Sequence, residues 1–166
     1  MNKTIIIRGG GDLATGTISC LHQCGYQVLV LEITNPTAIR RSVAFSEAMY
    51  DGETEVEGIK ARKITQFSEA EACWQDGIIP IISDEKAEAV KAVPHFAFMD
   101  AAIAKRNLGT TIDMADLVIG LGPGFTAGVD VDVVIETKRG HRLGRIIREG
   151  QAIANTGIPG IIGGYG

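Results

Sequence analysis

The sequence predicts an α/β fold with three layers, built on a mostly parallel, Rossmann-like sheet. Short apolar runs rich in β-branched residues alternate with segments of helical periodicity along the 166 residues of the chain. The first apolar run leads into three consecutive glycines and then into a helix-like segment, which is the order of a dinucleotide-binding βαβ unit. No repeat or linker-like tract interrupts this pattern. We therefore expect residues 1–166 to form a single Rossmann-like domain.

The first βαβ unit is expected between residues 4 and 33. Residues 4–7 and 27–33 are continuous apolar runs, typical of buried parallel strands. Between them, residues 13–24 show helical spacing, and Gly25 suits the position just after a helix end. Cys20 and Cys24 lie one turn apart, and we expect them on the core face of this helix.

The remaining elements follow in alternation. Thr34 or Asn35 can cap a helix that carries Pro36 in its first turn and ends near residues 51–52. Further along, Gly58 fits a β-bulge and Pro80 fits an edge strand. The other predicted elements are strand 56–64, helix 68–76, strand 78–82, helix 84–92 and strands 96–100, 117–121, 131–137 and 143–147.

Composition narrows the function classes. Hydrophobic residues make up 45% of the chain and charged residues 22%, as in a soluble globular domain, and the net charge of −4 disfavours nucleic acid as a partner. No apolar stretch approaches the roughly 20 residues of a membrane span. With no leader segment before the first strand, we expect a cytoplasmic protein without a membrane partner. The cysteines form no CxxC pair, and no metal site is expected.

The opening glycine-rich loop carries a dinucleotide fingerprint. Gly9, Gly11 and Ala14 fit the pattern G-x-G-x-x-G/A, and Glu32 ends the second strand where a ribose-binding acid belongs. Asp12 disfavours this interpretation, because a carboxylate at the start of a helix satisfies the free N–H groups and repels phosphate. The alternative is a tight turn between strand and helix, with Asp12 as the helix cap.

A second glycine-rich loop, "IGLGPGFTAG" at 119–128, also leaves the end of an apolar strand. Pro123 and Gly124 suit a type II turn, and Thr126 can donate a hydrogen bond to an anion. A ligand-binding loop is favoured over a simple connection, since long loops at this edge of a sheet usually carry function.

Charged residues follow several of the predicted strands. Because the carboxyl ends of parallel strands meet at one edge, these residues are expected to converge on a crevice rich in arginine and glycine N–H groups. Such a crevice suits a phosphorylated ligand. The alternative for each side chain taken alone is an exposed, solvated position. The charged residues concerned are Arg40, Arg41, Asp100, Lys105, Arg106, Glu136, Arg139 and His141.

Several long blocks resemble the YqeB-type proteins, which are accessory factors of selenium-dependent molybdenum hydroxylases related to the XdhC family. The blocks are "IRGGGDLATG" (7–16), "NPTAIRRSVAFSEAMYDGETEVEGI" (35–59), "DAAIAKRN" (100–107), "VIGLGPGFTAGVDVDVVIETKRGHRLGR" (118–145) and "NTGIPGIIGGYG" (155–166). The resemblance implies a Rossmann-like maturation factor that binds a pterin-type molybdenum cofactor and delivers it to a hydroxylase apoprotein. Such proteins extend beyond the position of Gly166, so the chain is also consistent with the N-terminal part of a longer protein.

The sequence supports one candidate site and three functional hypotheses. The preferred one is the maturation factor with its molybdenum cofactor; the alternatives are an NAD(P)-dependent oxidoreductase and a non-catalytic protein-assembly module. No catalytic triad can be assembled, so enzymatic activity stays open. The apolar segment 156–166 is a candidate homodimer contact. The residues expected to bind the cofactor are Arg8, Gly9, Gly10, Gly11, Asp12, Glu32, Arg40, Arg41, Asp100, Lys105, Arg106, Gly122, Pro123, Gly124, Phe125 and Thr126.

Overall fold

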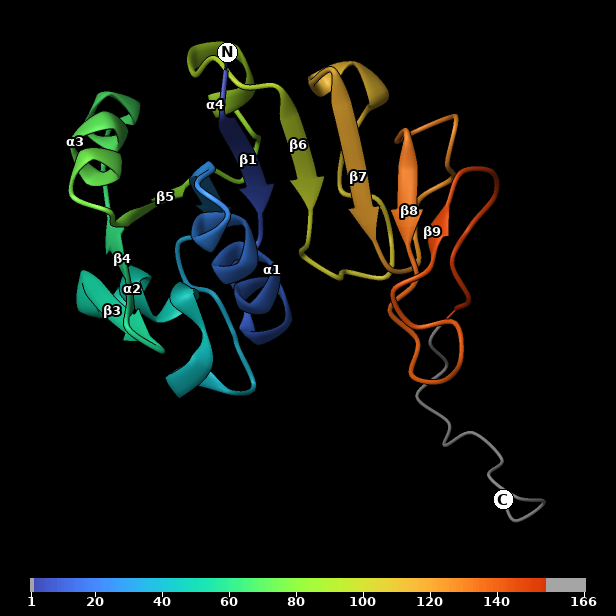
Figure 1. The fold of residues 1–166 in the computed structure, drawn as a ribbon, viewed down its shortest axis with the longest axis horizontal. Coiled ribbons are helices and arrows are strands. Elements are labelled where there is room, and N and C mark those ends of the chain that lie inside the picture. Colours follow the sequence, from blue (N-terminus) through green and yellow to red (C-terminus); the bar gives the residue numbers. More distant parts are fainter. Residues whose placement is uncertain (1, 155–166) are drawn as a thin grey trace.

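The structure, a computed structural model, describes residues 2–154. Within them, nine strands form one mixed sheet in the order β3-β4-β5-β2-β1-β6-β7-β8-β9 (Figure 1). The strands are β1 (Thr4–Arg8), β2 (Gln27–Glu32), β3 (Glu53–Val56), β4 (Ile59–Lys63), β5 (Ile79–Ser83), β6 (Ala97–Asp100), β7 (Leu117–Leu121), β8 (Val133–Ile135) and β9 (Ile146–Ile147). The α-helices are α1 (Asp12–Gln23), α2 (Ala48–Asp51), α3 (Ala70–Gln75) and α4 (Ala89–Ala92). Short 3₁₀ turns cover Arg41–Val43, Phe45–Glu47, Phe67–Glu69 and Ile112–Met114.

The order of the parallel strands is that of a Rossmann fold. The seven central strands, in the sheet order β4-β5-β2-β1-β6-β7-β8, are parallel to one another. At the two ends of the sheet, β3 pairs antiparallel with β4 and β9 pairs antiparallel with β8. The run β5-β2-β1-β6-β7-β8 repeats the 3-2-1-4-5-6 order of dinucleotide-binding sheets. The chain changes direction along the sheet between β1 and β6, and ligands of such sheets bind at this switch point, beyond the carboxyl ends of the strands.

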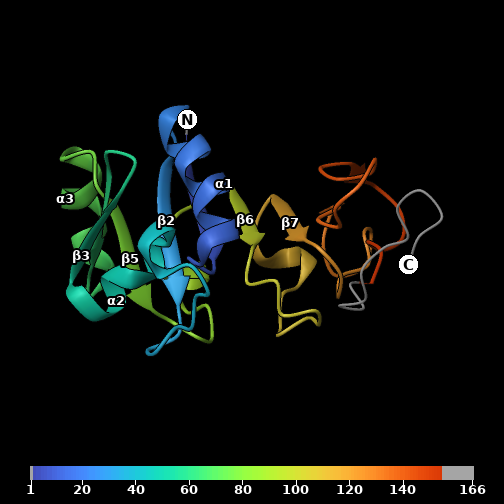
Figure 2. The ribbon, with the colours of Figure 1, turned by 90° about the horizontal axis from the view of Figure 1, so that it is seen from below.

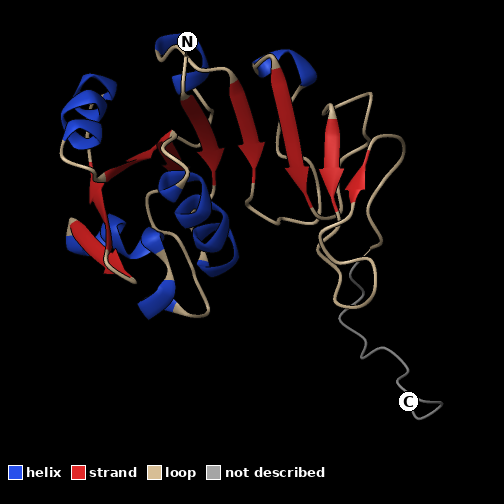
Figure 3. Ribbon diagram, viewed as in Figure 1, coloured by secondary structure: helices blue, strands red, loops and turns tan. Residues whose placement is uncertain are grey.

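Two apolar cores lie on opposite faces of the sheet and give the three layers. In β1, Ile5 and Ile7 belong to the core under α1 and α2, whereas Ile6 belongs to the core under α3 and α4. This alternation follows from the two-residue period of a strand. Figure 3 shows most of the helical segments near the strands β1 to β5 and one further helical turn beside β7, while loops flank the strands β8 and β9. The α/β, three-layer, mostly parallel prediction is confirmed.

Helix α1 buries a different stripe from the one predicted. Its buried residues are Ala14, Thr15 and Ile18, which face the sheet, whereas Cys20 and Cys24 are exposed. The prediction that both cysteines pack in the core is wrong, because the helix turns its Ala14–Ile18 side to the sheet.

The largest difference from prediction is at residues 34–47. No α-helix forms there; an irregular segment and two 3₁₀ turns precede α2, which begins only at Ala48. Residues 53–63 form a β-hairpin rather than one strand, because Glu57 and Gly58 both have positive φ, as in a two-residue turn. Gly58 is thus a turn residue and not a bulge.

Strand β5 lies inside the sheet, between β4 and β2, so Pro80 does not mark an edge. The proline is tolerated because the pairing with β2 begins only at Ile81, one residue later. Across residues 2–154, every helix is too short or too polar to cross a lipid bilayer.

Candidate functional site

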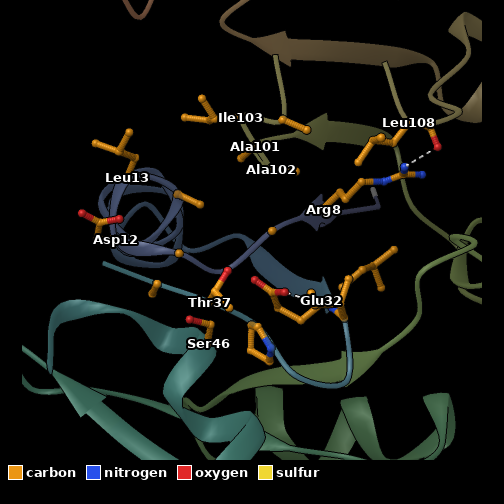
Figure 4. A pocket seen from close by; sticks show the side chains of 18 of the residues that line it. Arg8, Asp12, Leu13, Glu32, Thr37, Ser46, Ala101, Ala102, Ile103 and Leu108 are labelled. Atoms are coloured by element: carbon orange, nitrogen blue, oxygen red, sulfur yellow. Dashed lines mark hydrogen bonds between the residues drawn. The ribbon is translucent and has the colours of Figure 1, made fainter. Parts of the chain in front are cut away.

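A cavity of about 640 Å³ lies at the switch point, against the carboxyl ends of β1, β2 and β6. In Figure 1 the arrows of β1 and β6 point downward, and Figure 2 looks onto the edge where they end. The first turn of α1, residues 36–39 after β2, and residues 101–104 with Leu108 after β6 form its walls (Figure 4). The position is the one at which Rossmann sheets bind their ligands.

Packing constrains the first two glycines of the opening loop, Gly9 strictly and Gly10 less so. Gly9 has φ +98°, and a Cβ there would lie 2.9 Å from the backbone of Ala102. A Cβ on Gly10 would lie 3.2 Å from the Val30 side chain, and the carbonyl of Gly10 accepts a hydrogen bond from the Ser46 N–H at 2.8 Å. Both residues bring neighbouring strand ends close together, so neither identifies a ligand.

Gly11 differs from these two glycines, because neither a positive φ nor a close packing contact requires a glycine at this position. Its φ of −67° is open to any residue, and a Cβ there would meet nothing within 4 Å. Gly11 lines the cavity as the N-cap of α1, and no described side chain caps the helix. The backbone N–H groups of the first turn therefore face a space that a ligand can approach closely.

Asp12 does not cap α1, which corrects the prediction for this residue. It is the first residue of the helix, and its carboxylate lies 3.9 Å from the guanidinium Nε of Arg40. The Arg40 side chain is 69% exposed, so it offsets the negative charge only in part. The carboxylate leaves the N–H groups of the helix start free and still opposes an anion there.

Glu32 connects the end of β2 to the glycine loop. Its Oε1 accepts a hydrogen bond from the Gly10 N–H at 2.7 Å, and its Oε2 accepts one from the Ile33 N–H at 2.9 Å. Burial raises the pKa of this carboxyl group, and the two backbone hydrogen bonds oppose that rise. Each oxygen keeps a lone pair for a further donor, such as a ribose hydroxyl.

The cavity is not the arginine-rich crevice that the sequence predicts. Its charged lining residues are Arg8, Asp12, Glu32, Asp84 and Glu85. Acidic groups thus outnumber the basic one, and a ligand with several phosphates would meet repulsion.

The other predicted cations lie outside this lining. Arg41 makes two hydrogen bonds to Glu47, at 2.8 and 2.6 Å, and its guanidinium carbon lies 5.1 Å from the centre of the Tyr50 ring. Lys105 and Arg106 are exposed on the loop after β6.

Asp100 organises that loop from inside the protein. Its side chain is almost fully buried, and its two oxygens accept hydrogen bonds from the Ala102 N–H at 3.1 Å and the Thr110 hydroxyl at 2.7 Å. Asp100 does not line the cavity; its hydrogen bonds hold the loop whose residues 101–104 and Leu108 form the wall.

The second glycine-rich loop lies apart from the cavity. A Cβ on Gly120 would lie 2.5 Å from the Phe125 ring, one on Gly122 2.7 Å from the Thr137 hydroxyl, and one on Gly124 2.8 Å from the Arg106 backbone. Packing therefore accounts for these glycines, and none of Gly122, Pro123, Gly124, Phe125 and Thr126 lines the cavity.

The polar residues of the second loop are also engaged. The Thr126 N–H donates to Asp130, at 2.8 Å, and its hydroxyl accepts a hydrogen bond from Gln151, at 2.9 Å. Glu136, which follows β8, is buried and accepts hydrogen bonds from the backbone N–H groups of Lys138 and Ile153. Arg139 and His141 are exposed.

Part of the cavity wall was not anticipated. Residues Pro36 to Ile39 line it in an irregular conformation, although the sequence predicts a helix there. The available signal was Pro36 itself, since the residue before a proline is biased toward extended backbone. No group of His, Cys, Asp and Glu suited to a metal ion occurs within residues 2–154, and the candidate dimer segment 156–166 lies outside the described residues.

Comparison with known proteins gives one informative match. The chain is 46% identical over 164 residues to "Uncharacterized protein YqeB" of Escherichia coli (strain K12). The match covers 99% of this chain and 30% of the relative, so the chain spans about a third of that protein. No family model and no solved structure matches the chain. The resemblance to YqeB is confirmed, and the relation to XdhC stays a prediction.

Proposed function

We propose that this chain binds a pterin-type molybdenum cofactor, or its nucleotide form, at the carboxyl edge of the sheet, and that it acts in the cytoplasm in the maturation of a selenium-dependent molybdenum hydroxylase. The observation that carries the binding part is Gly11. It is the glycine of the opening loop that neither backbone strain nor packing requires, and it faces the 640 Å³ cavity. The open first turn of α1 offers N–H groups to a phosphate.

The residues at the cavity fit such a ligand in three respects. Gly11 permits close approach of a phosphate group to the helix N-terminus, and Glu32 can accept hydrogen bonds from ribose hydroxyls or from pterin N–H groups. Arg8 supplies a positive charge in the cavity lining. Because Arg8 is the one basic residue that the described part of the chain places in the lining, the cavity suits a ligand with a single phosphate or diphosphate group rather than one with several such groups. The maturation role rests on the resemblance of the sequence to YqeB-type proteins.

A matched pair of variants tests the binding proposal. Gly11→Ala adds one methyl group inside the cavity, whereas Gly16→Ala adds the same group to the exposed side of α1, where a Cβ also meets nothing within 4 Å. We expect Gly11→Ala to weaken binding of purified molybdopterin or its nucleotide form at least tenfold, and Gly16→Ala to leave it unchanged. Calorimetric titration of the full chain measures both. Equal affinities for the two variants would contradict the proposal.

A second candidate function is an NAD-dependent oxidoreductase. The position of Glu32 supports this candidate: it ends β2 and accepts a hydrogen bond from the Gly10 N–H, and in dinucleotide-binding sheets an acid at this position binds the adenosine ribose. The acidic lining also disfavours the additional phosphate of NADP. Fluorescence titration with NADH and NADPH tests this candidate: tight binding of NADH, with weaker binding of NADPH, supports it, and no binding of either removes it.

A third candidate is a non-catalytic assembly module that contacts a protein. Large apolar side chains are exposed around the cavity mouth, with Leu13 65% exposed and Ile39 97% exposed. Exposed apolar groups at a cavity rim are common in binding surfaces. If a protein partner is the main ligand, Leu13→Asp should abolish capture of the hydroxylase apoprotein, whereas Gly11→Ala should not.

A further inference from the structure

We propose that Arg8 forms an oxyanion subsite at the end of β1, separate from the first turn of α1, and that it binds a carboxylate or phosphate group of the ligand. The inference deepens the proposed function, because it concerns the same cavity, and it rests on that function for the identity of the ligand.

Arg8 is a buried cation with unused hydrogen-bond donors. Only 8% of the residue is exposed, yet it lines the cavity. A guanidinium carries five N–H donors. Within residues 2–154, its Nη1 donates to the Leu108 carbonyl at 3.2 Å, and its Nε is fully buried without any hydrogen-bond partner. Because Nε is enclosed by protein, the donors left for a ligand are the N–H groups of Nη1 and Nη2 that reach no acceptor among the described residues.

The neighbouring carboxylate does not complete the pairing. Asp100 Oδ2 lies 3.9 Å from Arg8 Nε, which is close enough for attraction and too far for a hydrogen bond. That oxygen already accepts the Thr110 hydroxyl, and the other accepts the Ala102 N–H. Asp100 therefore holds the positive charge of Arg8 in place without occupying the N–H groups of Nη1 and Nη2.

The guanidinium is fixed in position rather than free. Its central carbon lies 5.6 Å from the centre of the Phe98 ring, and its Nη1 is tied to Leu108. Figure 4 shows the Arg8 side chain running along the cavity wall toward Leu108, on the side away from Asp12 and Leu13. A guanidinium whose plane is fixed is suited to a planar or tetrahedral oxyanion, to which it can donate two parallel hydrogen bonds.

The two anion-binding features of the cavity are therefore on different residues and at different sides. The first turn of α1 offers backbone N–H groups beside Gly11, and Arg8 offers a charged side chain near the loop after β6. A ligand that spans the cavity with an acidic group at one end would use both. A ligand without that group would leave Arg8 unsatisfied.

Nuclear magnetic resonance of arginine side chains tests the subsite directly. The Nε–H signals of Arg8 and Arg41 are identified by their loss in Arg8→Lys and Arg41→Lys. The chain is then titrated at constant ionic strength with inorganic phosphate and, separately, with malonate. Arg41 is the matched control, because its Nε already donates to Glu47. We expect the Arg8 signal to shift saturably and the Arg41 signal to stay unchanged.

Each outcome decides the proposal. A saturable shift with phosphate alone assigns a phosphate group to the subsite, and one with malonate alone assigns a carboxylate. No saturable shift with either, or parallel shifts of both arginines, overturns the proposal. Arg8→Lys should weaken binding of the effective anion at least about tenfold, because an ammonium cannot donate the paired hydrogen bonds. Should this variant fail to fold, the titration of the unmodified chain decides alone.

Titration of the same sample with the nucleotide form of the cofactor separates the two proposals. A shift of the Gly11 amide without a shift of Arg8 supports the proposed function and overturns the subsite. A response of Arg8 to phosphate or malonate, together with no binding of the cofactor, supports the subsite and contradicts the proposed function.

Discussion

The two glycine-rich loops look alike in the sequence and differ in what surrounds them. Each leaves the carboxyl end of a parallel strand, the first after β1 and the second at the end of β7. In the second loop, a Cβ on Gly120, Gly122 or Gly124 would lie only 2.5 to 2.8 Å from a neighbouring side chain or backbone. In the first loop, Gly11 faces the open cavity. A high glycine content therefore does not identify a ligand site; the space around each glycine does.

The largest expected effect concerns the glycines that packing requires. In both Gly9→Ala and Gly124→Ala the new methyl group meets backbone atoms within 3.0 Å, at φ values of +98° and +112°. We expect each to lower the free energy of unfolding by about 3 kcal/mol, from combined backbone strain and overpacking. Urea denaturation measures this loss.

The same experiment on Gly11→Ala completes the comparison. Its free energy of unfolding should fall by no more than about 1 kcal/mol, because nothing lies within 4 Å of the added methyl group and the only cost is that alanine is a poorer N-cap than glycine. A loss as large as that of Gly9→Ala would show that Gly11 is a structural glycine, and the case for a ligand at this position would fail.

A second prediction concerns the loop after β6, which supports the first glycine loop. Asp100→Asn removes the carboxylate beside the buried Arg8 and disturbs the hydrogen bonds to Ala102 and Thr110. We expect a loss of about 2 kcal/mol in the free energy of unfolding.

A double-mutant cycle identifies the source of that loss. Combined with Arg8→Met, Asp100→Asn should cost less than it does alone, because no unpaired cation is then left buried. Additive losses in denaturation experiments would show that Arg8 and Asp100 are not coupled.

A smaller effect is expected at Asp12, where the first loop carries a charge that opposes anions. Asp12→Asn should tighten binding of inorganic phosphate severalfold, because it removes the repulsion at the helix start. It should also lower the free energy of unfolding by about 0.5 kcal/mol, because the helix dipole loses a favourable charge. Phosphate titration and thermal unfolding measure the two changes, which have opposite directions; weaker phosphate binding would contradict the assignment.

The smallest effect is a dependence on pH that the first loop carries through Glu32. Burial raises the pKa of this carboxyl group above its ordinary value of 4.5, so the folded protein binds the proton more tightly than the unfolded chain does. The folded state is therefore penalised at neutral pH, and the penalty is relieved as the pH falls through the raised pKa. The stability of the unmodified chain relative to Glu32→Gln should rise on acidification toward pH 4.5. Denaturation at several pH values checks the sign.

The sequence predicts the parallel sheet well, because buried strands are continuous apolar runs. Residues 117–121 were predicted as a strand with the bounds that the structure shows. The irregular conformation of residues 34–47 was not predicted, because the spacing of their polar and apolar residues is compatible with a helix. The contacts that hold this segment are made with the glycine loop, which is distant in the sequence. One such contact is the hydrogen bond from the Ser46 N–H to the Gly10 carbonyl.

The candidate site was predicted in part for a related reason. The motif at Gly9, Gly11 and Glu32 depends on local spacing, and the structure brings these residues together beside the cavity. The role of the second loop depends on distant partners: Thr137 fills the space beside Gly122, and the Arg106 backbone fills that beside Gly124. No spacing rule reveals such contacts.

The position of β1 has a consequence for the order in which the molecule is made. β1 pairs with β2, which follows closely in the chain, and also with β6, where Ile5 lies opposite Ala97. During synthesis the ribosome must release the loop after β6 before the second wall of the cavity can exist. The half-sheet β1–β5 can form earlier, with the side of β1 that later pairs with β6 still unpaired. A ligand that needs both walls would therefore bind only after this long-range pairing, and it would stabilise the contact that forms late.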